Sequence, residues 1–263
     1  MGRGAMKTML RNSLRACGRL LRLAGEVLLA LLDFVINVIF RPKLSLTRAR
    51  SLWLQQTCRR ALRVLGVTVT TDGTIPLKGL LVCNQFSFVD IFVISAITPA
   101  VFISSSEVKR LPILGWFASL SGTMFVRRSH RSDVTRLNQE FSQILSNGGL
   151  VVLFPEPVDS NTDAGVGPFR SSLLEPAARL KQRITAAAII YTITENSTEP
   201  EMRHRVKTNF TPRLISLLFT DRVNATVSFT RLEKSNGNRK ELARRLRKYV
   251  EKPEEPSARL PVA

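Results

Sequence analysis

Short apolar runs recur through the middle of the chain, and amphipathic stretches separate them. Apolar runs of this length, bounded by turn residues, predict buried strands, whereas a three-to-four-residue spacing predicts helices. The order of strand and helix repeats, which favours an α/β fold with a mixed, largely parallel sheet flanked by helices. Strands are predicted at residues 67–70, 80–83, 101–104, 123–126, 150–154, 186–192 and 225–229.

Turn and helix signals complete this pattern. A helix is predicted over residues 44–65, and Gly66 should end it because glycine is common just past a helix. Asp72 and Gly73 predict a turn after the first strand. Beyond Pro253 the chain is polar, and we expect it to be flexible. Further helices are predicted at 87–97, 107–120, 133–147, 170–182, 210–219 and 235–250, the last of them basic.

The first 65 residues have a different pattern. Their leading segment predicts an amphipathic helix that suits the headgroup region of a bilayer, with leucines away from a basic stripe. Residues 27–40 follow and are almost wholly apolar, although Asp33 and Asn37 interrupt them and Glu26 precedes them. The stripe itself recurs at every third or fourth position and comprises Lys7, Arg11, Arg15, Arg19 and Arg22.

We interpret this segment as a monotopic or half-inserted membrane anchor. A single spanning helix is the alternative, although a span needs about 20 mostly apolar residues. A core helix of the domain is a further alternative that the dense arginine flanks disfavour. The chain is thus predicted to comprise anchoring helices at 1–65, an α/β domain at 66–232, and a basic helix with a flexible tail at 233–263.

Net charge indicates which class of binding partner to expect, and cysteine content indicates the redox environment. The formal net charge is +19, and residues 1–63 contribute +11 of it, with thirteen Lys and Arg residues against Glu26 and Asp33. This charge predicts a polyanionic partner, and its position favours an anionic bilayer surface. No nucleic-acid-binding motif is visible, so no nucleic acid partner is expected. Three widely spaced cysteines indicate neither a disulfide framework nor a zinc site, and they favour a reducing, cytoplasmic face.

One stretch combines several polar groups at a strand-to-helix junction. Residues 84–90 read Asn-Gln-Phe-Ser-Phe-Val-Asp, between the strand at 80–83 and the next helix. With other blocks in the same order, this stretch resembles the 1-acylglycerol-3-phosphate (lysophospholipid) acyltransferase family, which carries Asn-His-x-Ser-x-x-Asp there. Gln85 occupies the histidine position. The other blocks are residues 122–128, 152–156, 168–172 and 189–191.

The resemblance implies acyl transfer from a thioester, on coenzyme A or acyl carrier protein, to a lysolipid hydroxyl at a membrane. It implies no cofactor beyond that acyl donor, and no metal. In the family the histidine is the base and the aspartate orients it, which assigns Asp90 the orienting position. The acceptor would contact Asn84, Ser87, Arg127, Arg128, Phe154, Pro155, Glu156 and Arg170.

Gln85 changes the expected activity. An amide has no titratable group near neutrality, so it cannot take the proton from the acceptor hydroxyl. A general base contributes about 10²–10⁴-fold, and activity should therefore be low. Pro157 and Val158 also depart from the family's Gly and Thr. The alternative is a non-catalytic lipid-binding relative on the same fold.

Other residues are weaker candidates for the missing base or for a nucleophile. His130 is interpreted as a surface residue, with a relocated base as the alternative, and His204 as solvated. Cys83 ends an apolar strand, which is typical of a packed core residue and less so of a nucleophile. Ser87 is expected to cap the following helix. The weakest hypothesis is a basic adaptor at a membrane surface or on nucleic acid, because only the net charge supports it.

Overall fold

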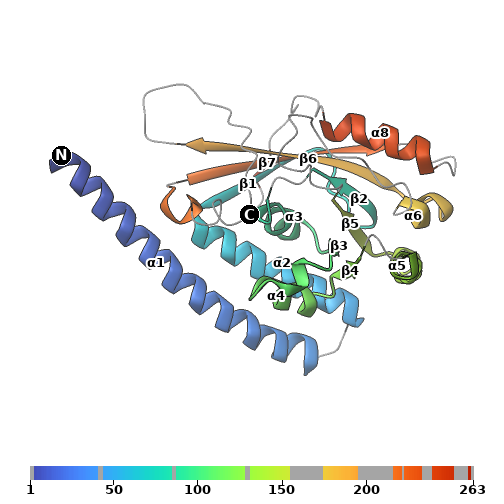
Figure 1. Ribbon diagram of the computed structural model, residues 1–263, viewed down its shortest axis with the longest axis horizontal. Helices are drawn as coiled ribbons and strands as arrows, with labels where there is room; N and C mark the ends of the chain where they lie inside the picture. Colours follow the sequence, from blue (N-terminus) through green and yellow to red (C-terminus); the bar gives the residue numbers. More distant parts are fainter. Residues whose placement is uncertain are drawn as a thin grey trace.

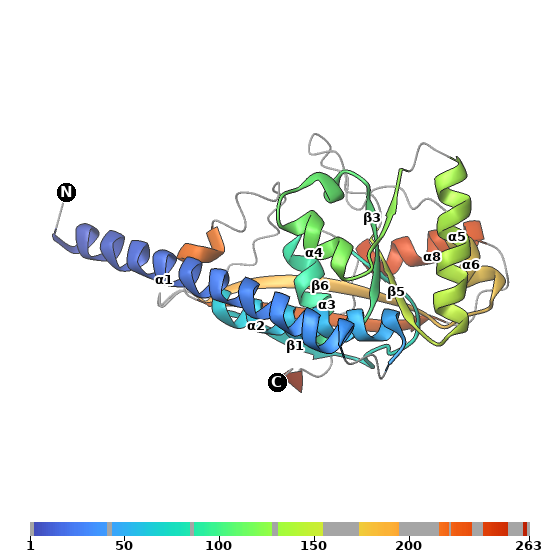
Figure 2. The ribbon, with the colours of Figure 1, turned by 90° about the horizontal axis from the view of Figure 1, so that it is seen from below.

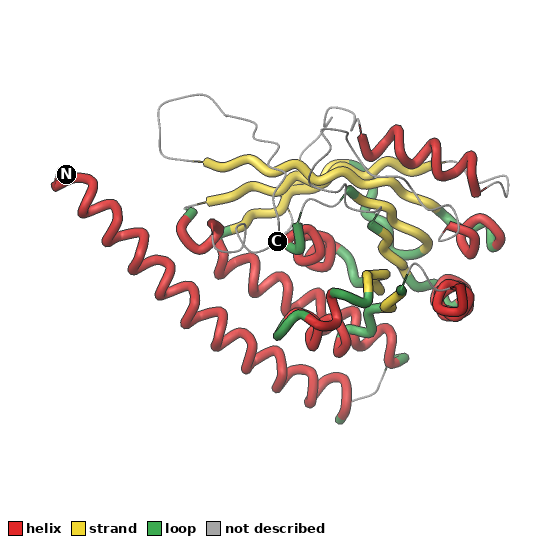
Figure 3. The backbone as a smooth tube through the Cα atoms, in the orientation of Figure 1, coloured by secondary structure: helices red, strands yellow, loops and turns green. Residues whose placement is uncertain are grey.

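The computed structural model describes residues 3–40, 44–84, 87–127, 131–154, 174–194, 216–220, 222–232, 239–251 and 260–261. Within them lies one eight-stranded sheet in the order β4-β3-β5-β2-β6-β7-β1-β8. Figures 1 and 3 show this sheet with helices packed against it. All neighbours are parallel except the antiparallel pairs β6–β7 and β1–β8. The strands are β1 Val67–Asp72, β2 Gly79–Cys83, β3 Val101–Ser105, β4 Met124–Val126, β5 Leu150–Leu153, β6 Ile184–Thr194, β7 Arg222–Leu232 and β8 Leu260–Pro261.

Burial explains why β2 and β5 occupy the middle of the sheet. Every residue of both strands is buried, as expected for parallel strands that helices cover on both faces. Successive side chains point to opposite faces, so Leu81 and Cys83 contribute to one core while Leu80 and Val82 contribute to the other. The predicted strands and the mixed, largely parallel sheet are confirmed.

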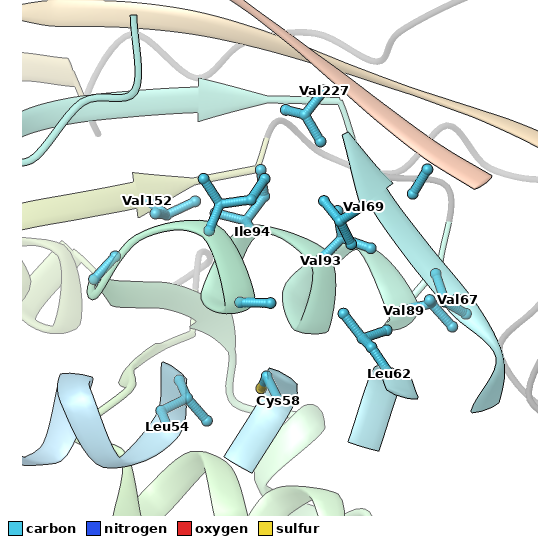
Figure 4. Packing of buried hydrophobic residues seen from close by; sticks show 14 of the residues in the cluster. Leu54, Cys58, Leu62, Val67, Val69, Val89, Val93, Ile94, Val152 and Val227 are labelled. Atoms are coloured by element: carbon cyan, nitrogen blue, oxygen red, sulfur yellow. The ribbon is translucent and has the colours of Figure 1, made fainter. Parts of the chain in front are cut away.

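One face of the sheet carries α3 (Val89–Ile97) and then α2 (Leu46–Leu65). Figure 4 shows the packing: Val93 and Ile94 of α3 lie between the sheet and the α2 residues Leu54, Cys58 and Leu62. Gly66 ends α2 as predicted, with φ of 73° and its N–H donating to Arg63 and Leu62. The helix α3 is apolar nearly all round because it lies between two layers.

The opposite face carries α5 (Arg131–Ser146), α6 (Glu175–Arg179) and α8 (Arg239–Glu251). Leu137 and Phe141 of α5 and Leu246 of α8 pack onto Leu80, Val82 and their neighbours in β3 and β5. Helices therefore cover both faces of the sheet, and its strand ends remain at the edges. Parallel strands that share an orientation bring their carboxyl ends to one edge, which is where the polar residues of the sequence blocks are expected.

The first helix, α1 (Arg3–Phe34), runs along α2 and continues into a π-helical segment, Val35–Ile39 (Figure 1). Its N-terminal part projects beyond the sheet (Figure 2). Trp53 of α2 joins the two helices, because its indole N–H donates to the carbonyl of Ala30 at 2.7 Å and its ring meets Phe34 edge-on. Within the ranges described, none of the helices combines the length and apolar character needed to cross a bilayer.

The acidic residues that interrupt the apolar segment of α1 have a partner on α2. Arg60 Nε lies 2.9 Å from Glu26 Oε2, and the Arg60 NH2 group lies 2.7 Å from Asp33 Oδ2. These distances are those of ion pairs, but the groups are not aligned as hydrogen bonds. The side chains are less than one-third exposed, so both acidic groups serve the contact between helices.

Two members of the predicted basic stripe bind protein groups, which corrects that interpretation for them. Arg19 is buried, and its guanidinium donates to the carbonyls of Leu217, Leu218 and Thr220. Arg15 donates to the carbonyl of Phe219 in the same segment. These carbonyls lie at the end of the helical turn at 216–219, where backbone acceptors lack helical partners and attract cations.

Three further predictions differ in extent. The helix predicted at 107–120 is divided into a 3₁₀ turn, Val108–Arg110, and α4, Leu114–Leu120, because Pro112 holds Leu111 in an extended conformation. Of the helices predicted at 170–182 and 210–219, only α6 and the turn at 216–219 fall within the residues described. The strand β8 pairs with β1 in a segment where none is predicted.

Candidate active site

Asn84 ties the end of β2 to the neighbouring strand β6. Its Oδ1 accepts the N–H of Ile189 at 2.8 Å, and its Nδ2 donates to the carbonyl of the same residue at 3.2 Å. The side chain is buried, with only 4% of the residue exposed. The side-chain amide thus makes the two hydrogen bonds to Ile189 that the backbone of a neighbouring strand would make. Asn84 therefore fixes β6 against the β2–α3 junction.

Asp90 lies in the first turn of α3 and is fully buried. Its Oδ2 accepts the N–H of Ser87 at 2.7 Å, and its Oδ1 accepts the hydroxyl of Tyr191 at 2.5 Å. Ser87 Oγ accepts the N–H of Val89, the first residue of α3, at 3.2 Å, so Ser87 binds the start of the helix from the position before the N-cap residue Phe88. The buried carboxylate is held between the junction and β6.

Tyr191 is the residue of this site that sequence reasoning missed. It lies on β6, two residues beyond Ile189, so both side chains face the layer that contains α3. The ring is half-buried against the core, and its hydroxyl bonds to Asp90. The available signal was a phenol within an apolar strand, because a buried tyrosine hydroxyl usually has a hydrogen-bond partner.

Cys83 is a packed core thiol beside the junction. It is fully buried, and its Sγ lies 3.5 Å from Asn84 Oδ1 as a donor. Burial, and then the negative charge of Asp90, raise the pKa of this thiol well above its ordinary value. The protonated thiol is a poor nucleophile, so the environment of Cys83 fits the core interpretation.

Thiol reactivity should follow this burial. Treatment of the native protein with iodoacetamide is expected to modify Cys17, which is exposed, and to spare Cys58 and Cys83. Burial raises the pKa of Cys58 to about 12, which disfavours its thiolate as well. Peptide mass spectrometry measures the labelling at each position, with unfolded protein as the fully labelled control. Native labelling of Cys83 as fast as that of Cys17 would contradict the assignment.

Arg127 follows β4 and is accessible to solvent. Its side chain is 57% exposed, and its Nε donates to Asp133 Oδ2 of α5 at 2.8 Å. This hydrogen bond from Arg127 lowers the pKa of the Asp133 carboxyl. In the sheet order, β3 and β5 separate β4 from β2, so roughly 14 Å of strand spacing lies between Arg127 and the Asn84 junction.

Phe154 follows β5 and is directed into the protein. It is 5% exposed, and its ring stacks on Phe102 of β3 with centroids 6.1 Å apart. The structure therefore brings Asn84, Ser87 and Asp90 together at one junction, with Phe154 at the end of a neighbouring strand. The following candidates and departures lie outside the described residues: Gln85, Arg128, His130, Pro155, Glu156, Pro157, Val158, Arg170 and His204.

The described site provides hydrogen-bonding groups and one buried carboxylate. Among the ranges that the structure describes, no group of three or more His, Cys, Asp or Glu side chains could hold a metal ion. The site offers Asp90, the phenol of Tyr191 and the amide of Asn84 at the carboxyl edge of a parallel sheet. In open α/β sheets, this edge is where ligands bind.

Comparison with known proteins identifies the family of this domain. A family model described as acyltransferase matches residues 66–194. This segment, which contains β1 to β6 and the β2–α3 junction, is similar to the acyltransferase family. The resemblance read from the sequence blocks is thereby confirmed.

Two relatives match about half of the chain. A 1-acyl-sn-glycerol-3-phosphate acyltransferase of Neisseria gonorrhoeae is 34% identical over 130 residues, 48% of this chain and 50% of that protein. A lyso-ornithine lipid O-acyltransferase of Pseudomonas aeruginosa is 31% identical over 140 residues, 53% of this chain and 52% of that protein. The chain thus spans about half the length of the curated relatives it matches.

A solved structure shows the same fold over nearly the whole chain. The 1-acyl-sn-glycerophosphate acyltransferase PlsC of Thermotoga maritima superposes with a TM-score of 0.63. The match covers 93% of this chain and 95% of that one, at 16% sequence identity. The likeness therefore includes the N-terminal helices as well as the sheet.

Proposed function

We propose that this protein is a membrane-associated O-acyltransferase with low turnover, which transfers an acyl chain from acyl-CoA or acyl-ACP to a lysolipid hydroxyl. The β2–α3 junction supports this most, because a buried Asp90 is held by two donors at the carboxyl edge of a sheet of the acyltransferase family. The relatives named for acyl-glycerol-phosphate and lyso-ornithine lipid acylation support a lysolipid acceptor.

The reaction needs a base for the acceptor hydroxyl. As that oxygen attacks the thioester carbonyl, its proton must leave, and the departing thiolate must gain one. Asp90 is in the position that orients a histidine in the family, and Gln85 stands where that histidine would be. An amide can hold the hydroxyl by hydrogen bonds without taking its proton, which is the physical reason for low turnover.

The acceptor headgroup is proposed to lie along the carboxyl edge of the sheet. Arg127 is exposed there, and although its Nε donates to Asp133, its other guanidinium N–H groups can donate to an anionic group in bidentate fashion. Arg128, which the family register favours for this contact, and Arg170 would add positive charge, and the segment from Phe154 to Glu156 would position the remainder. These assignments are carried over from the matching sequence blocks.

Membrane association is proposed to use the outer face of α1. Its inner face is committed to α2, whereas large apolar side chains are exposed on the outer face beside Arg11 and Arg22. An amphipathic helix of this composition binds in the plane of an anionic bilayer surface. The positive charge and free thiols favour the cytoplasmic face. The exposed apolar residues are Leu10, Leu14, Leu20, Leu21, Leu28, Leu29 and Leu32.

Vesicle binding should depend on this face. Leu21 and Leu28 are 76% and 69% exposed, and replacing both with Glu is expected to weaken binding to anionic vesicles more than about tenfold. The matched control is Leu77→Glu, because Leu77 is 65% exposed in the β1–β2 loop, away from α1. Co-sedimentation measures both. Equal binding by the double variant and the control would contradict the proposed face.

The class of reaction is tested by transfer from radiolabelled acyl-CoA, and separately acyl-ACP, to a panel of lysolipids. We expect slow transfer that depends on the protein and on a free acceptor hydroxyl. A non-catalytic lipid-binding protein is the second candidate, and the three departures Gln85, Pro157 and Val158, gathered in the motif blocks, favour it. Lysolipid binding without transfer by the wild type or by Gln85→His would support that candidate instead.

A further inference from the structure

The hydroxyl of Tyr191 belongs to a partly exposed side chain and is hydrogen-bonded to the buried carboxylate of Asp90. Asp90 is fully buried, so its oxygens have no direct access to solvent. Tyr191 is half-buried, and its hydroxyl donates to Asp90 Oδ1 at 2.5 Å. A proton that reaches the Tyr191 oxygen therefore has a continuous hydrogen-bonded route to the carboxylate.

The surrounding bonds fix this pair in place. Ser87 N–H holds the second carboxylate oxygen at 2.7 Å, and Asn84 holds the backbone of Ile189 two residues before Tyr191. Both ends of the Tyr191–Asp90 contact are thus anchored to the same β2–α3 junction. Such pre-arranged hydrogen bonds are the usual setting for proton transfer in a catalytic site.

We propose that Tyr191 and Asp90 form a proton relay that replaces the missing histidine base. The inference rests on the proposed acyltransferase function. As the acceptor oxygen attacks the thioester carbonyl, its proton passes to the Tyr191 oxygen while the tyrosine proton passes to Asp90. The C–S bond then breaks, and the thiolate leaving group takes a proton back from Asp90 through Tyr191. Acyl thioester and alcohol thereby become ester and thiol, with every proton returned.

A phenol suits this task because it donates and accepts at the same oxygen. An amide at position 85 can hold the acceptor hydroxyl but cannot carry its proton. The relay would therefore supply the proton transfer in the wild-type protein, and Gln85 would supply orientation alone. Where a histidine is restored at position 85, the imidazole would take over as base, and the relay would no longer be needed.

The test is a double-mutant cycle with four proteins: wild type, Tyr191→Phe, Gln85→His, and the variant with both changes. Acyl transfer is measured at several lysolipid concentrations, so that kcat and KM are separated. We expect Tyr191→Phe to lower the wild-type kcat at least about tenfold, with KM changed less than about twofold. In the Gln85→His background, the same change should lower kcat less than about twofold.

The chain supplies a matched control for the lost hydroxyl. Tyr249 is the other tyrosine, and it is half-buried on α8 against the core on the opposite face of the sheet. Tyr249→Phe should leave the wild-type kcat unchanged. Thermal unfolding of each variant separates a loss of folded protein from a loss of proton transfer.

Each outcome bears on the relay. A Tyr191→Phe variant with wild-type kcat overturns it, as does an equal loss in both backgrounds, which would mean that Tyr191 only packs and holds Asp90. An inactive wild type beside an active Gln85→His variant overturns the relay while the acyltransferase site stands. Absence of transfer from all four proteins would instead reject the proposed function itself.

Discussion

Gln85→His is expected to raise the rate of acyl transfer by about 10–10³-fold, because a positioned general base contributes about 10²–10⁴-fold and the Tyr191–Asp90 relay already supplies about tenfold of it. The variant places an imidazole five residues before Asp90, directly after Asn84, at a junction whose flanking bonds are already formed. The gain should appear mainly in kcat, because the base acts as the acceptor attacks. Initial rates with acyl-CoA or acyl-ACP and the preferred lysolipid measure it.

Gln85→Asn is the control for this variant. It keeps an amide at the position and adds no titratable group, so it should not raise the rate above that of the wild type. A Gln85→His protein that binds lysolipid and remains as slow as Gln85→Asn would mean that the missing imidazole is not what limits the site. Pro157 and Val158 would then be the next residues to restore.

Asp90→Asn is expected to abolish transfer and to destabilise the fold. The carboxylate accepts from Ser87 N–H and from the Tyr191 hydroxyl, and an amide would turn its NH₂ group toward one of these donors. Loss of a buried charged hydrogen bond, with one donor left unpaired, lowers the free energy of unfolding by about 2–4 kcal/mol. Transfer should fall at least about 10²-fold, also in the Gln85→His background.

Asp133→Asn is the matched control for the lost carboxylate. Asp133 binds Arg127 at the surface, away from the β2–α3 junction, so its replacement should change stability much less. Chemical unfolding and transfer assays of the two variants answer separate questions. If Asp90→Asn were as stable as Asp133→Asn and as active as the wild type, Asp90 would have neither the structural nor the catalytic role assigned to it.

The sheet could be predicted from the sequence because its strands are short apolar runs separated by helices of clear periodicity. The burial of β2 follows from residues 80–83, an apolar run without charged side chains, and the structure shows every residue of this strand buried. The β2–α3 junction was predictable for the same reason: a strand ends, polar residues follow, and an apolar helix begins. The pattern places Ser87 and Asp90 at this junction, and the resemblance to the acyltransferase family implies their part in the site.

Contacts between distant segments could not be predicted from local patterns. Arg19 continues a basic stripe in sequence, yet it binds the carbonyls of Leu217, Leu218 and Thr220, about 200 positions away. Glu26 and Asp33 interrupt an apolar run, and only the packing of α1 on α2 brings Arg60 to them. Periodicity assigns a residue to a face of its own helix, but tertiary packing decides what that face meets.

Tyr191 illustrates the same limit within the candidate site. Its strand reads as a continuous apolar run, and nothing local distinguishes a tyrosine that packs from one that bonds to Asp90, 101 positions earlier. The parallel pairing of β2 with β6 creates this contact, because it brings the residues near the ends of both strands to one edge. A tyrosine near the carboxyl end of a strand is nevertheless a signal worth testing in related sequences.

The most direct test of the account compares the wild type and Asp90→Asn, purified side by side, by mass spectrometry of the products. The wild type should form O-acylated lysolipid and free thiol in equal amounts, and Asp90→Asn, folded under the assay conditions, should form neither. Equal ester formation by both proteins would contradict the account, because the reaction would then not depend on the β2–α3 junction.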